Sequence, residues 1–322
     1  MVDKKSCMNF CFSSDDKYVQ ALIVILTSLK VNHPTEYLNI HILDSGISDE
    51  NKKKVLYLQN QDIKINFIRI NDDLINNYKL PPKTHFTTAI LTRLRIPELF
   101  PNLDRMLYLD IDMIILKNLT QLYNVNLDRC LLGMVKDFKE EECKKYLSVK
   151  NYYNSGLILF DIKKCTKFNF TEKMIYALIN SKNLKFPDQD VINKNCQNMI
   201  KSLDFVYNSQ INPEVSNNIK QIKQNINNTY ILHYTGPIKP WKSKYNPFEE
   251  YYLKYLKLTP FREIYYKICF YKFIVKICNF IYSIKKLDNI KYFCFLKIPI
   301  LKTTRRDGFK YFYVFGFLLA KV

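Results

Sequence analysis

Apolar residues in the first 110 positions of this 322-residue chain follow two alternating patterns. Short runs that are apolar, or that alternate between apolar and polar positions, are typical of strands. Longer segments with helical spacing separate these runs and begin with acidic or Ser/Asn residues. We therefore expect strands over residues 8–14, 37–44, 62–70 and 105–110, and helices over 15–34, 48–60 and 87–100, the last ending near Pro97.

This order of strands and helices predicts an α/β fold, a mixed and mainly parallel sheet flanked by helices on both faces. Ligands of such sheets bind at the carboxyl ends of the strands, where acids stand at Asp15 and Asp110. Further along, the pattern predicts a strand over 151–161 and a helix over 187–198. A short strand within 228–241 then gives way to a Gly/Pro loop.

The composition changes near residue 259, so we expect a domain over residues 1–258 and a basic tail over 259–322. Residues 261–322 hold thirteen Lys or Arg and three Asp or Glu, a net charge of +10 out of +19 for the whole chain. About half of the excess positive charge therefore lies in the last fifth of the sequence.

The tail combines helical spacing with repeated aromatic residues. Residues 264–287 predict an amphipathic helix with lysines on its polar face. Two segments, 291–302 and 310–321, share Lys-Tyr-Phe at the start and Lys at the end. A basic amphipathic segment of this kind is typical of a membrane interface. The alternative is a helix that docks on the first domain.

Charge and cysteine content narrow the class of partner and the compartment. A net charge of +19 suits an anionic membrane surface, an anionic substrate or nucleic acid, and a Lys-rich codon bias also contributes. The nine cysteines contain no C-x-x-C pair, which is typical of reduced thiols in the cytosol. Without a secretory pattern or about 18 uninterrupted apolar residues, we expect a cytoplasmic protein that lies on, and does not span, a membrane.

Two aspartates, Asp110 and Asp112, follow the apolar run at 105–109. On a strand, side chains two positions apart share a face, so the two carboxylates would converge. Two nearby carboxylates repel unless a cation lies between them, and Mg²⁺ or Mn²⁺ suits carboxylate oxygens. The pattern alone is weak, because a second D-x-D occurs at 188–190, and a helix cap or a solvated turn is the alternative.

A loop near residue 233 carries further chemistry. His233 ends an apolar strand, and Gly236, Lys239 and Trp241 follow it. The imidazole would favour Mn²⁺ over Mg²⁺, the glycine lets the backbone approach a ligand, and the lysine offers a point charge for phosphate. The alternative is a core histidine satisfied by its neighbours. Since neither G-x-G-x-x-G nor G-x-x-x-x-G-K-[ST] occurs, a bound phosphate would rely on metal and lysine.

Taken together in order, these motifs resemble the family-8 glycosyltransferases, in particular the bacterial branch that extends lipopolysaccharide or lipooligosaccharide cores. The likeness covers roughly residues 8 to 258. Its motifs are "FSSDDKY" (12–18), "HILDSGIS" (41–48), "LTRLRIPELFP" (91–101), "RMLYLDIDMII" (105–115), "YYNSGLILFDIKK" (152–164), "FPDQDVIN" (186–193) and "LHYTGPIKPW" (232–241).

The resemblance implies a GT-A fold and a retaining hexosyltransferase that uses UDP-galactose or UDP-glucose as donor and Mn²⁺, or Mg²⁺, as cofactor. It also implies a lipid-linked oligosaccharide acceptor at the cytoplasmic face of an anionic inner membrane, with no nucleic-acid partner. Asp110, Asp112 and His233 correspond to the metal ligands of the family.

The remaining site residues are also carried over by position. The resemblance implies a nucleotide pocket at Ser13, Ser14, Asp15, Tyr18 and Ile111, diphosphate contacts at Gly236 and Lys239, and donor-sugar or active-site roles for Arg93, Asp137, Asn154, Asp188 and Gln189. Gln189 and Asp190 are the candidates for a group beneath the sugar, for either a covalent glycosyl-enzyme or a front-face attack. Simpler roles are a helix cap for Asp188, a strand-edge turn for Asn154 and a surface ion pair for Arg93.

Two other functions compete with this interpretation. In haloacid-dehalogenase-type phosphohydrolases a D-x-D follows the first strand, but here about a hundred residues precede the acids, and Ile114 replaces the usual Thr or Val. A basic membrane- or nucleic-acid-binding protein without catalysis would fit the net charge. No short RNA-binding signature occurs in the sequence, which disfavours nucleic acid.

Overall fold

The computed structural model describes residues 7–70, 78–80, 88–212, 216–241, 246–287, 290–295, 298–306, 309–314 and 317–321. The chain divides into two compact units, residues 1–260 and residues 261–322. Each unit is described by itself below.

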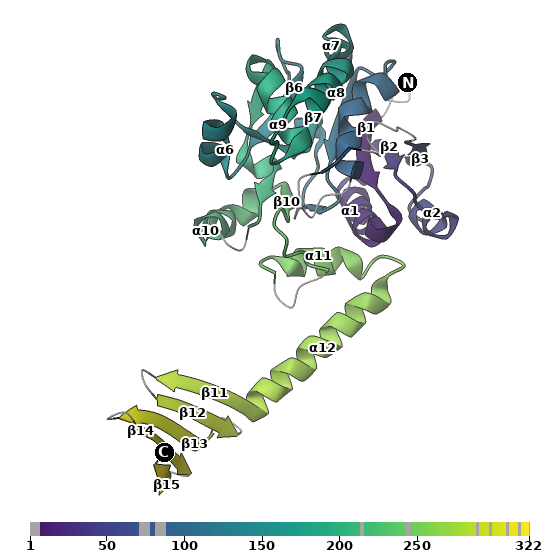
Figure 1. Cartoon of the computed structure of the whole chain (residues 1–322). Helices are drawn as coiled ribbons and strands as arrows, with labels where there is room; N and C mark the ends of the chain where they lie inside the picture. The colour runs from purple at the N-terminus through teal and green to yellow at the C-terminus, as the bar shows by residue number, and fades with distance from the viewer. Residues whose placement is uncertain are drawn as a thin grey trace. The chain divides into compact units, whose positions relative to one another are not determined.

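A seven-stranded mixed sheet forms the centre of the first unit, with the order β3-β2-β1-β4-β7-β6-β8 (Figure 1). Only β7 runs antiparallel to its two neighbours, and the other pairs are parallel. The fold class expected from the sequence is therefore confirmed. The strands are β1 (Cys7–Ser14), β2 (Tyr37–Asp44), β3 (Ile63–Arg69), β4 (Arg105–Leu109), β6 (Leu132–Lys136), β7 (Tyr153–Asp161) and β8 (Ile200–Leu203).

The direction of β7 decides what gathers at one edge of the sheet. Since β7 is antiparallel to β4 and β6, its first residues lie beside the last residues of those strands. The edge that carries the carboxyl ends of β1, β4 and β6 therefore also carries Asn154, Ser155 and Gly156 at the start of β7. Polar groups from four strands meet there.

A small second sheet, in the order β5-β10-β9, continues from this edge. It consists of β5 (Met113–Ile115), β9 (Ser209–Gln210) and β10 (Ile231–His233). The chain leaves β4 at Leu109, turns through residues 110–112 and enters β5. The aspartate pair therefore lies on a turn between two sheets and not on one strand, so the strand-based reason for its convergence was wrong.

Helices flank the central sheet (Figure 1). Alternate residues of β4 and β7, such as Tyr108 and Phe160, share one buried apolar cluster with residues of α8 and α9. The almost wholly buried α1 packs against β5 and α11. These helices are α1 (Val19–Asn32), α2 (Asp49–Leu56), α5 (Thr120–Tyr123), α6 (Glu140–Leu147), α7 (Ile162–Lys167), α8 (Phe170–Asn180), α9 (Pro187–Asn195), α10 (Ser216–Asn225) and α11 (Glu249–Leu256).

The helix expected over 87–100 has a different form. A 3-10 helix, η2 (Thr88–Arg95), leads into the short α4 (Ile96–Leu99). Pro97 lies in the first turn of α4 and not at its end, which agrees with the tolerance of proline where the backbone N–H has no helical partner. The described residues of this unit also form the 3-10 segments η1 (Asp16–Tyr18), η3 (Gln197–Met199), η4 (Phe205–Tyr207) and η5 (Ile226–Asn228).

The described residues of the second unit form one helix and one sheet. The helix α12 (Arg262–Ile281) ends six residues before the expected position, so the prediction of a helix through Leu287 was wrong there. A five-stranded antiparallel sheet follows in chain order. Its strands are β11 (Tyr282–Leu287), β12 (Ile290–Phe295), β13 (Ile298–Arg306), β14 (Phe309–Val314) and β15 (Phe317–Lys321).

Pairing explains why the helix stops. Each residue of β11 lies opposite one of β12, from Tyr282 with Phe295 to Leu287 with Ile290, so the sheet ladder supplies the backbone hydrogen bonds that a helix would otherwise make. Among the described residues, no helix is both apolar enough and long enough to cross a bilayer.

Candidate active site

A pocket of about 430 Å³ opens at the edge where β1, β4 and β6 end and β7 begins. Fifteen of the sixteen site residues expected from the sequence line it, which brings together segments up to about 220 positions apart. They are Ser13, Ser14, Asp15, Tyr18, Arg93, Asp110, Ile111, Asp112, Asp137, Asn154, Asp188, Gln189, His233, Gly236 and Lys239.

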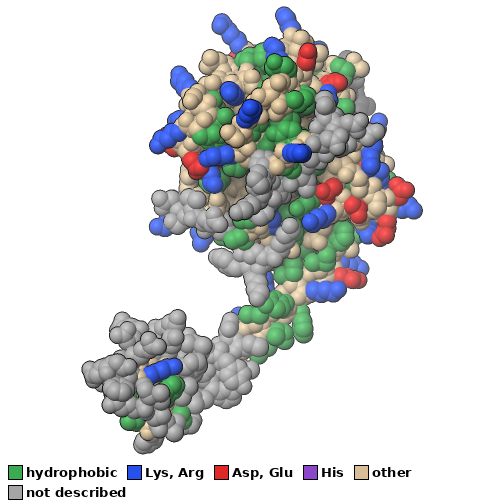
Figure 2. Space-filling model, in the orientation of Figure 1, with side chains coloured by type: hydrophobic (Ala, Val, Ile, Leu, Met, Phe, Trp, Pro, Cys, Tyr) green, Lys and Arg blue, Asp and Glu red, His purple; other side chains and the backbone are tan. Residues whose placement is uncertain are grey.

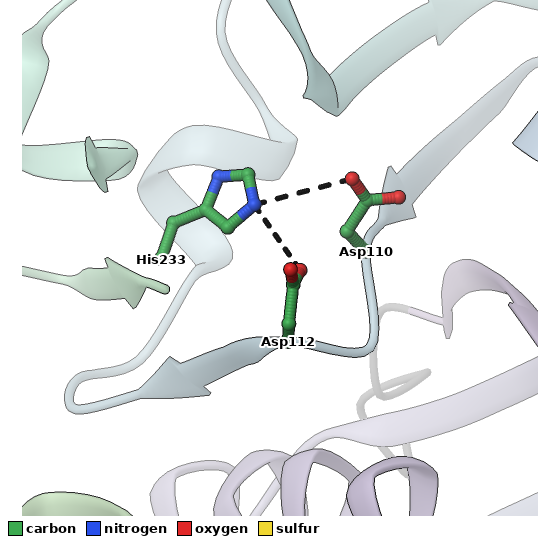
Figure 3. Close-up of side chains that lie close together, drawn as sticks. All are labelled: Asp110, Asp112 and His233. Atoms are coloured by element: carbon green, nitrogen blue, oxygen red, sulfur yellow. Dashed lines mark ion pairs between the residues drawn. The ribbon is translucent and has the colours of Figure 1, made fainter. Parts of the chain in front are cut away.

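Asp110, Asp112 and His233 form an acid–imidazole cluster in this pocket (Figure 3). One ligand atom from each residue lies within 4.8 Å of the others. His233 Nε2 is 3.1 Å from Oδ1 of Asp112 and 4.0 Å from Oδ2 of Asp110. The turn after β4 and the end of β10 therefore aim three potential metal ligands at one point.

Hydrogen bonds to its Oδ1 and from its backbone N–H fix the orientation of Asp110. Its Oδ1 accepts hydrogen bonds from the guanidinium of Arg93 and from the hydroxyl of Tyr108, each at 2.8 Å. Its backbone N–H donates to the carbonyl of Gly156 at 2.8 Å. With Oδ1 engaged, Oδ2 is the oxygen that faces the imidazole.

Asp112 stays ionised although it is half-buried. Burial raises its pKa, but the nearby ammonium group of Lys239 outweighs that effect and holds the pKa well below its usual range. Lys239 Nζ lies 2.5 Å from Oδ2 of Asp112 and donates to the carbonyl of Tyr234. The same lysine is thus placed between a carboxylate of the cluster and the open pocket.

The cluster suits a divalent cation. Within the part of the chain that the structure describes, Oδ1 of Asp112 is buried without a hydrogen-bond partner, an arrangement that costs free energy unless a cation is bound. Two carboxylates and one imidazole also match the oxygen and nitrogen donors that Mn²⁺ accepts, and the residues therefore fit the metal implied by the sequence.

Gly156 is a site residue that the sequence did not reveal. A Cβ atom at this position would overlap Cε1 of His233 and would lie 2.9 Å from Oδ2 of Asp110. Only a glycine leaves the imidazole room to approach the acids here. The signal in the sequence was the lone glycine in "YYNSGLILFD", but its meaning depends on the distant His233.

Arg93 is not a surface ion-pair residue, since only 2% of its surface is exposed. Its guanidinium binds the Asp110 carboxylate, the Asp188 carboxylate at 3.2 Å and the carbonyl of Ser155 at 2.6 Å, and it lies over the ring of Tyr108. Burial works against its charge, but the nearby Asp110, Tyr108 and Asp188 outweigh it and raise its pKa. Arg93 thus lies between the half-buried Asp110 and the buried Asp188 and neutralises both carboxylates.

Asp188 and Gln189 come to the pocket on the first turn of α9. Burial raises the pKa of Asp188, although Arg93 and the hydroxyl of Ser155 counteract that effect. Gln189 Oε1 accepts from the Ser155 N–H at 2.8 Å, and its Nε2 donates to Asp137 at 3.1 Å. Both side chains are held by side chains and backbone of the strand edge, and the cap of α9 is not their main contact.

Asp190 is the exception among the expected residues, because it does not line the pocket. It is fully buried on the other side of α9. Its carboxylate accepts hydrogen bonds from the hydroxyl of Tyr152 and from the backbone N–H groups of Lys185 and Phe186. Asp190 therefore fixes the chain that enters α9, and in this structure it does not line the pocket in which the sequence predicted a group beneath the donor sugar.

The segment after β1 forms another wall of the pocket. The Ser13 hydroxyl donates to the carbonyl of Ala89 at 2.8 Å, and the Ser14 hydroxyl donates to that of Asp15 at 3.0 Å. Among the described residues, Oδ1 of Asp15 is buried without a hydrogen-bond partner. Asp15 is therefore the polar group of this wall that is available to a ligand.

The mixed sheet of this unit has the GT-A fold of LgtC, and the acid–imidazole cluster lies at the carboxyl edge of that sheet. The chain belongs to glycosyl transferase family 8, since the model of that family matches residues 9–245. This membership confirms the resemblance seen in the sequence and sets aside the phosphohydrolase and the non-enzymatic binding protein as alternatives.

Individual relatives agree with the family. The chain is 30% identical over 278 residues to a lipopolysaccharide 1,2-glucosyltransferase of Escherichia coli (strain K12), and the match covers 81% of each protein. The structure is similar to that of the galactosyltransferase LgtC, with a TM-score of 0.68 and 24% identity over 79% of this chain and 96% of LgtC. It is also similar to the bifunctional WbbM (TM-score 0.69, 22% identity), of which the match covers 52% and 83% of this chain.

Proposed function

We propose that this glycosyltransferase moves galactose or glucose from a UDP-sugar to a lipopolysaccharide- or lipooligosaccharide-type acceptor, with retention of the anomeric configuration. The names of its relatives support this proposal, since one is a lipopolysaccharide glucosyltransferase and another a galactosyltransferase. The observation that carries it is the convergence of Asp110, Asp112 and His233 within 4.8 Å beside a pocket at the carboxyl edge of the sheet.

We infer that these three residues hold Mn²⁺ or Mg²⁺ beside the donor diphosphate. The cation would stabilise the negative charge that develops on the departing UDP. Lys239, between Asp112 and the open pocket, adds a second positive charge at the same place, and Gly236 lets the backbone come close to the phosphates. Asp15 is the proposed polar contact of the nucleoside.

The residues around α9 are proposed to hold the sugar. Asp188, Arg93 and Asn154 line the pocket beside Gln189, the residue that we place beneath the reacting carbon. The Gln189 carbonyl oxygen already accepts a hydrogen bond from Ser155, and an amide oxygen in that state is a poor nucleophile. With Asp190 buried elsewhere, this arrangement favours front-face attack over a covalent glycosyl-enzyme.

We also propose that residues 261–322 bind the anionic cytoplasmic face of the inner membrane. The helix α12 carries large exposed aromatic side chains, with 65% of Phe270 and 59% of Phe273 accessible, between lysines at 267, 272 and 276. Apolar and basic side chains on one helix suit an interface of acyl chains and acidic headgroups. By contrast, Lys and Arg side chains are dispersed over the visible face of residues 1–260 (Figure 2).

A panel of UDP-sugars tests the catalytic proposal. The purified protein is incubated with each donor and Mn²⁺, and the release of UDP is measured with and without a lipooligosaccharide core acceptor. We expect release from UDP-galactose or UDP-glucose that increases with acceptor and stops with EDTA. Release that persists after chelation, or that requires a donor other than a UDP-hexose, would contradict the proposal.

A further inference from the structure

We propose that Asn208 is a positioning residue for the metal site, because it holds His233 in the tautomer that leaves the lone pair on Nε2. This inference rests on the proposed function, since it concerns a residue behind the proposed metal ligands. Asn208 lies between η4 and β9, is fully buried and does not line the pocket. Its side chain is therefore placed to act through the imidazole and not on a substrate.

A chain of buried hydrogen bonds begins at Asp137, whose carboxylate can only accept hydrogen bonds when ionised. Asn154 donates from Nδ2 to Oδ2 of Asp137 at 3.0 Å. On the other side, Oδ1 of Asn154 accepts from the backbone N–H of Gly156, also at 3.0 Å. An acceptor and a donor thus fix the two ends of the Asn154 amide, which settles its orientation.

That orientation determines the next amide. Oδ1 of Asn154 also faces Nδ2 of Asn208 at 2.9 Å, so the amide nitrogen of Asn208 must point toward Asn154. The carbonyl oxygen of Asn208 then faces His233 Nδ1, at 2.9 Å. An amide oxygen cannot donate, so the proton of this hydrogen bond belongs to Nδ1 of the imidazole.

A proton on Nδ1 leaves the lone pair of the neutral imidazole on Nε2, the atom that faces Asp112 and Asp110. This is the tautomer that a metal ligand needs at Nε2. Partners of this kind orient metal-bound histidines in other proteins, and their loss costs about 10–100-fold in metal affinity or activity. The chain of hydrogen bonds from Asp137 through Asn154 and Asn208 to His233 therefore fixes the imidazole tautomer in which Nε2 can bind a metal.

The test compares two buried amides that lie two residues apart. Asn208→Leu removes the acceptor for Nδ1 and keeps the number and branching of the side-chain heavy atoms. Gln210→Met is the matched control, because Gln210 is equally buried and lies beside His233 in the β9–β10 ladder, but its side chain bonds the backbone of Phe138 and Lys136 and not the imidazole. Asn208→Asp restores an acceptor for Nδ1 at the cost of a buried charge.

Two measurements apply to each variant: the affinity for Mn²⁺ in the presence of UDP, from the electron paramagnetic resonance signal of free Mn²⁺, and the tautomer of His233 in the metal-free protein. Nitrogen-15 NMR of labelled histidine gives the tautomer, with His233→Ala to assign the signal. We expect a protonated Nδ1 in the wild type and in Gln210→Met. In Asn208→Leu we expect a mixture of tautomers and an affinity 10–100-fold lower.

The aspartate variant separates positioning from packing. We expect Asn208→Asp to recover the Nδ1-protonated form and to bind Mn²⁺ more tightly than Asn208→Leu, whereas a residue that only fills space would tolerate leucine better than a buried charge. The proposal is overturned if Asn208→Leu keeps the wild-type tautomer and affinity, or if Gln210→Met loses as much affinity. A wild type that binds no Mn²⁺ would contradict the proposed function instead, and the tautomers alone would then decide the role of Asn208.

Discussion

The substitution Gly156→Ala tests whether the close packing of His233 and Asp110 against Gly156 is needed for metal binding. The added methyl group would overlap Cε1 of His233 and lie 2.9 Å from Oδ2 of Asp110. Carbon atoms pack at about 3.5–4.0 Å, so the imidazole must retreat by about 1 Å. A misplacement of that size costs about 100-fold in rate, equivalent to about 2.7 kcal/mol of transition-state stabilisation.

The fold itself should survive this substitution. Gly156 does not adopt the left-handed backbone conformation, which the structure gives only to Gly46 among the described glycines, so an alanine fits its backbone. The steric conflict is confined to side chains of the site. We therefore expect a thermal unfolding midpoint close to that of the wild type together with a large loss of Mn²⁺ affinity and of UDP release.

Gly133→Ala is the matched control, in the neighbouring strand β6. Its added methyl group would lie 2.9 Å from a methyl carbon of Leu127 and 3.2 Å from one of Leu203, in the apolar core. We expect this variant to unfold at a lower temperature but to bind Mn²⁺ normally. If Gly156→Ala kept wild-type metal affinity and turnover, the close approach of His233 to Asp110 would not matter, and the reasoning would be refuted.

Three further predictions concern other parts of the chain. Asp110→Asn should abolish transfer, because it removes one proposed metal ligand. It should leave the circular dichroism spectrum unchanged, because the amide oxygen can still accept the hydrogen bond from Arg93. Residual transfer near the wild-type rate would count against the metal site. Removal of residues 261–322 should release the protein from vesicles that contain anionic lipid but preserve UDP-sugar hydrolysis, and unchanged sedimentation with the vesicles would refute the membrane role of the tail. Burial, with a smaller contribution from Lys64, lowers the pKa of His41 to about 4, so below the ordinary pKa of about 6.5 the unfolded chain takes up a proton while the folded chain does not. The free energy of unfolding should therefore fall by up to about 3 kcal/mol from pH 6.5 to pH 4. Urea unfolding at several pH values should show a smaller fall for His41→Leu, and an equal fall in both proteins would contradict this assignment.

The aspartate pair shows how much of the site a local sequence pattern can predict. The structure brings Asp110 and Asp112 together with His233 in one pocket, although the D-x-D pattern alone was a weak signal. The pattern did not predict their geometry, because the chain does not continue as one strand: Asp110 N bonds to the Gly156 carbonyl, and the backbone then crosses into β5 beside β10. That crossing depends on partners 46 and more positions away, which a local pattern does not contain.

Gly156 and Asn208 show the same limit of local sequence patterns, because the sequence did not reveal either residue as part of the site. Each looks ordinary in the sequence, and each acquires its role from contacts across β7, β9 and β10. Asp190 is the reverse case, since it belongs to a motif of the family yet does not line the pocket, and its carboxylate binds the buried Tyr152 hydroxyl. Helical periodicity places alternate residues of such a motif on different faces, so a motif alone does not assign a role to each member.

The tail shows how a periodic pattern can serve two structures. Residues 282–287 continue the helical spacing of α12, but they also alternate well enough to pair with Ile290–Phe295 as an antiparallel hairpin. Short apolar and basic runs fit either conformation, and the pairing partner decides between them. The related segments at 291–302 and 310–321 each begin within a strand, β12 and β14, of the same sheet.

The central claim is that one cation is bound jointly by two carboxylates and the imidazole of His233. Electron spin-echo envelope modulation of Mn²⁺ in its complex with the protein and UDP detects a directly bound nitrogen. We predict a ¹⁴N coupling that is present in the wild type and disappears in His233→Gln. Bound Mn²⁺ that shows no nitrogen coupling in the wild type, or the same coupling in His233→Gln, would contradict the account.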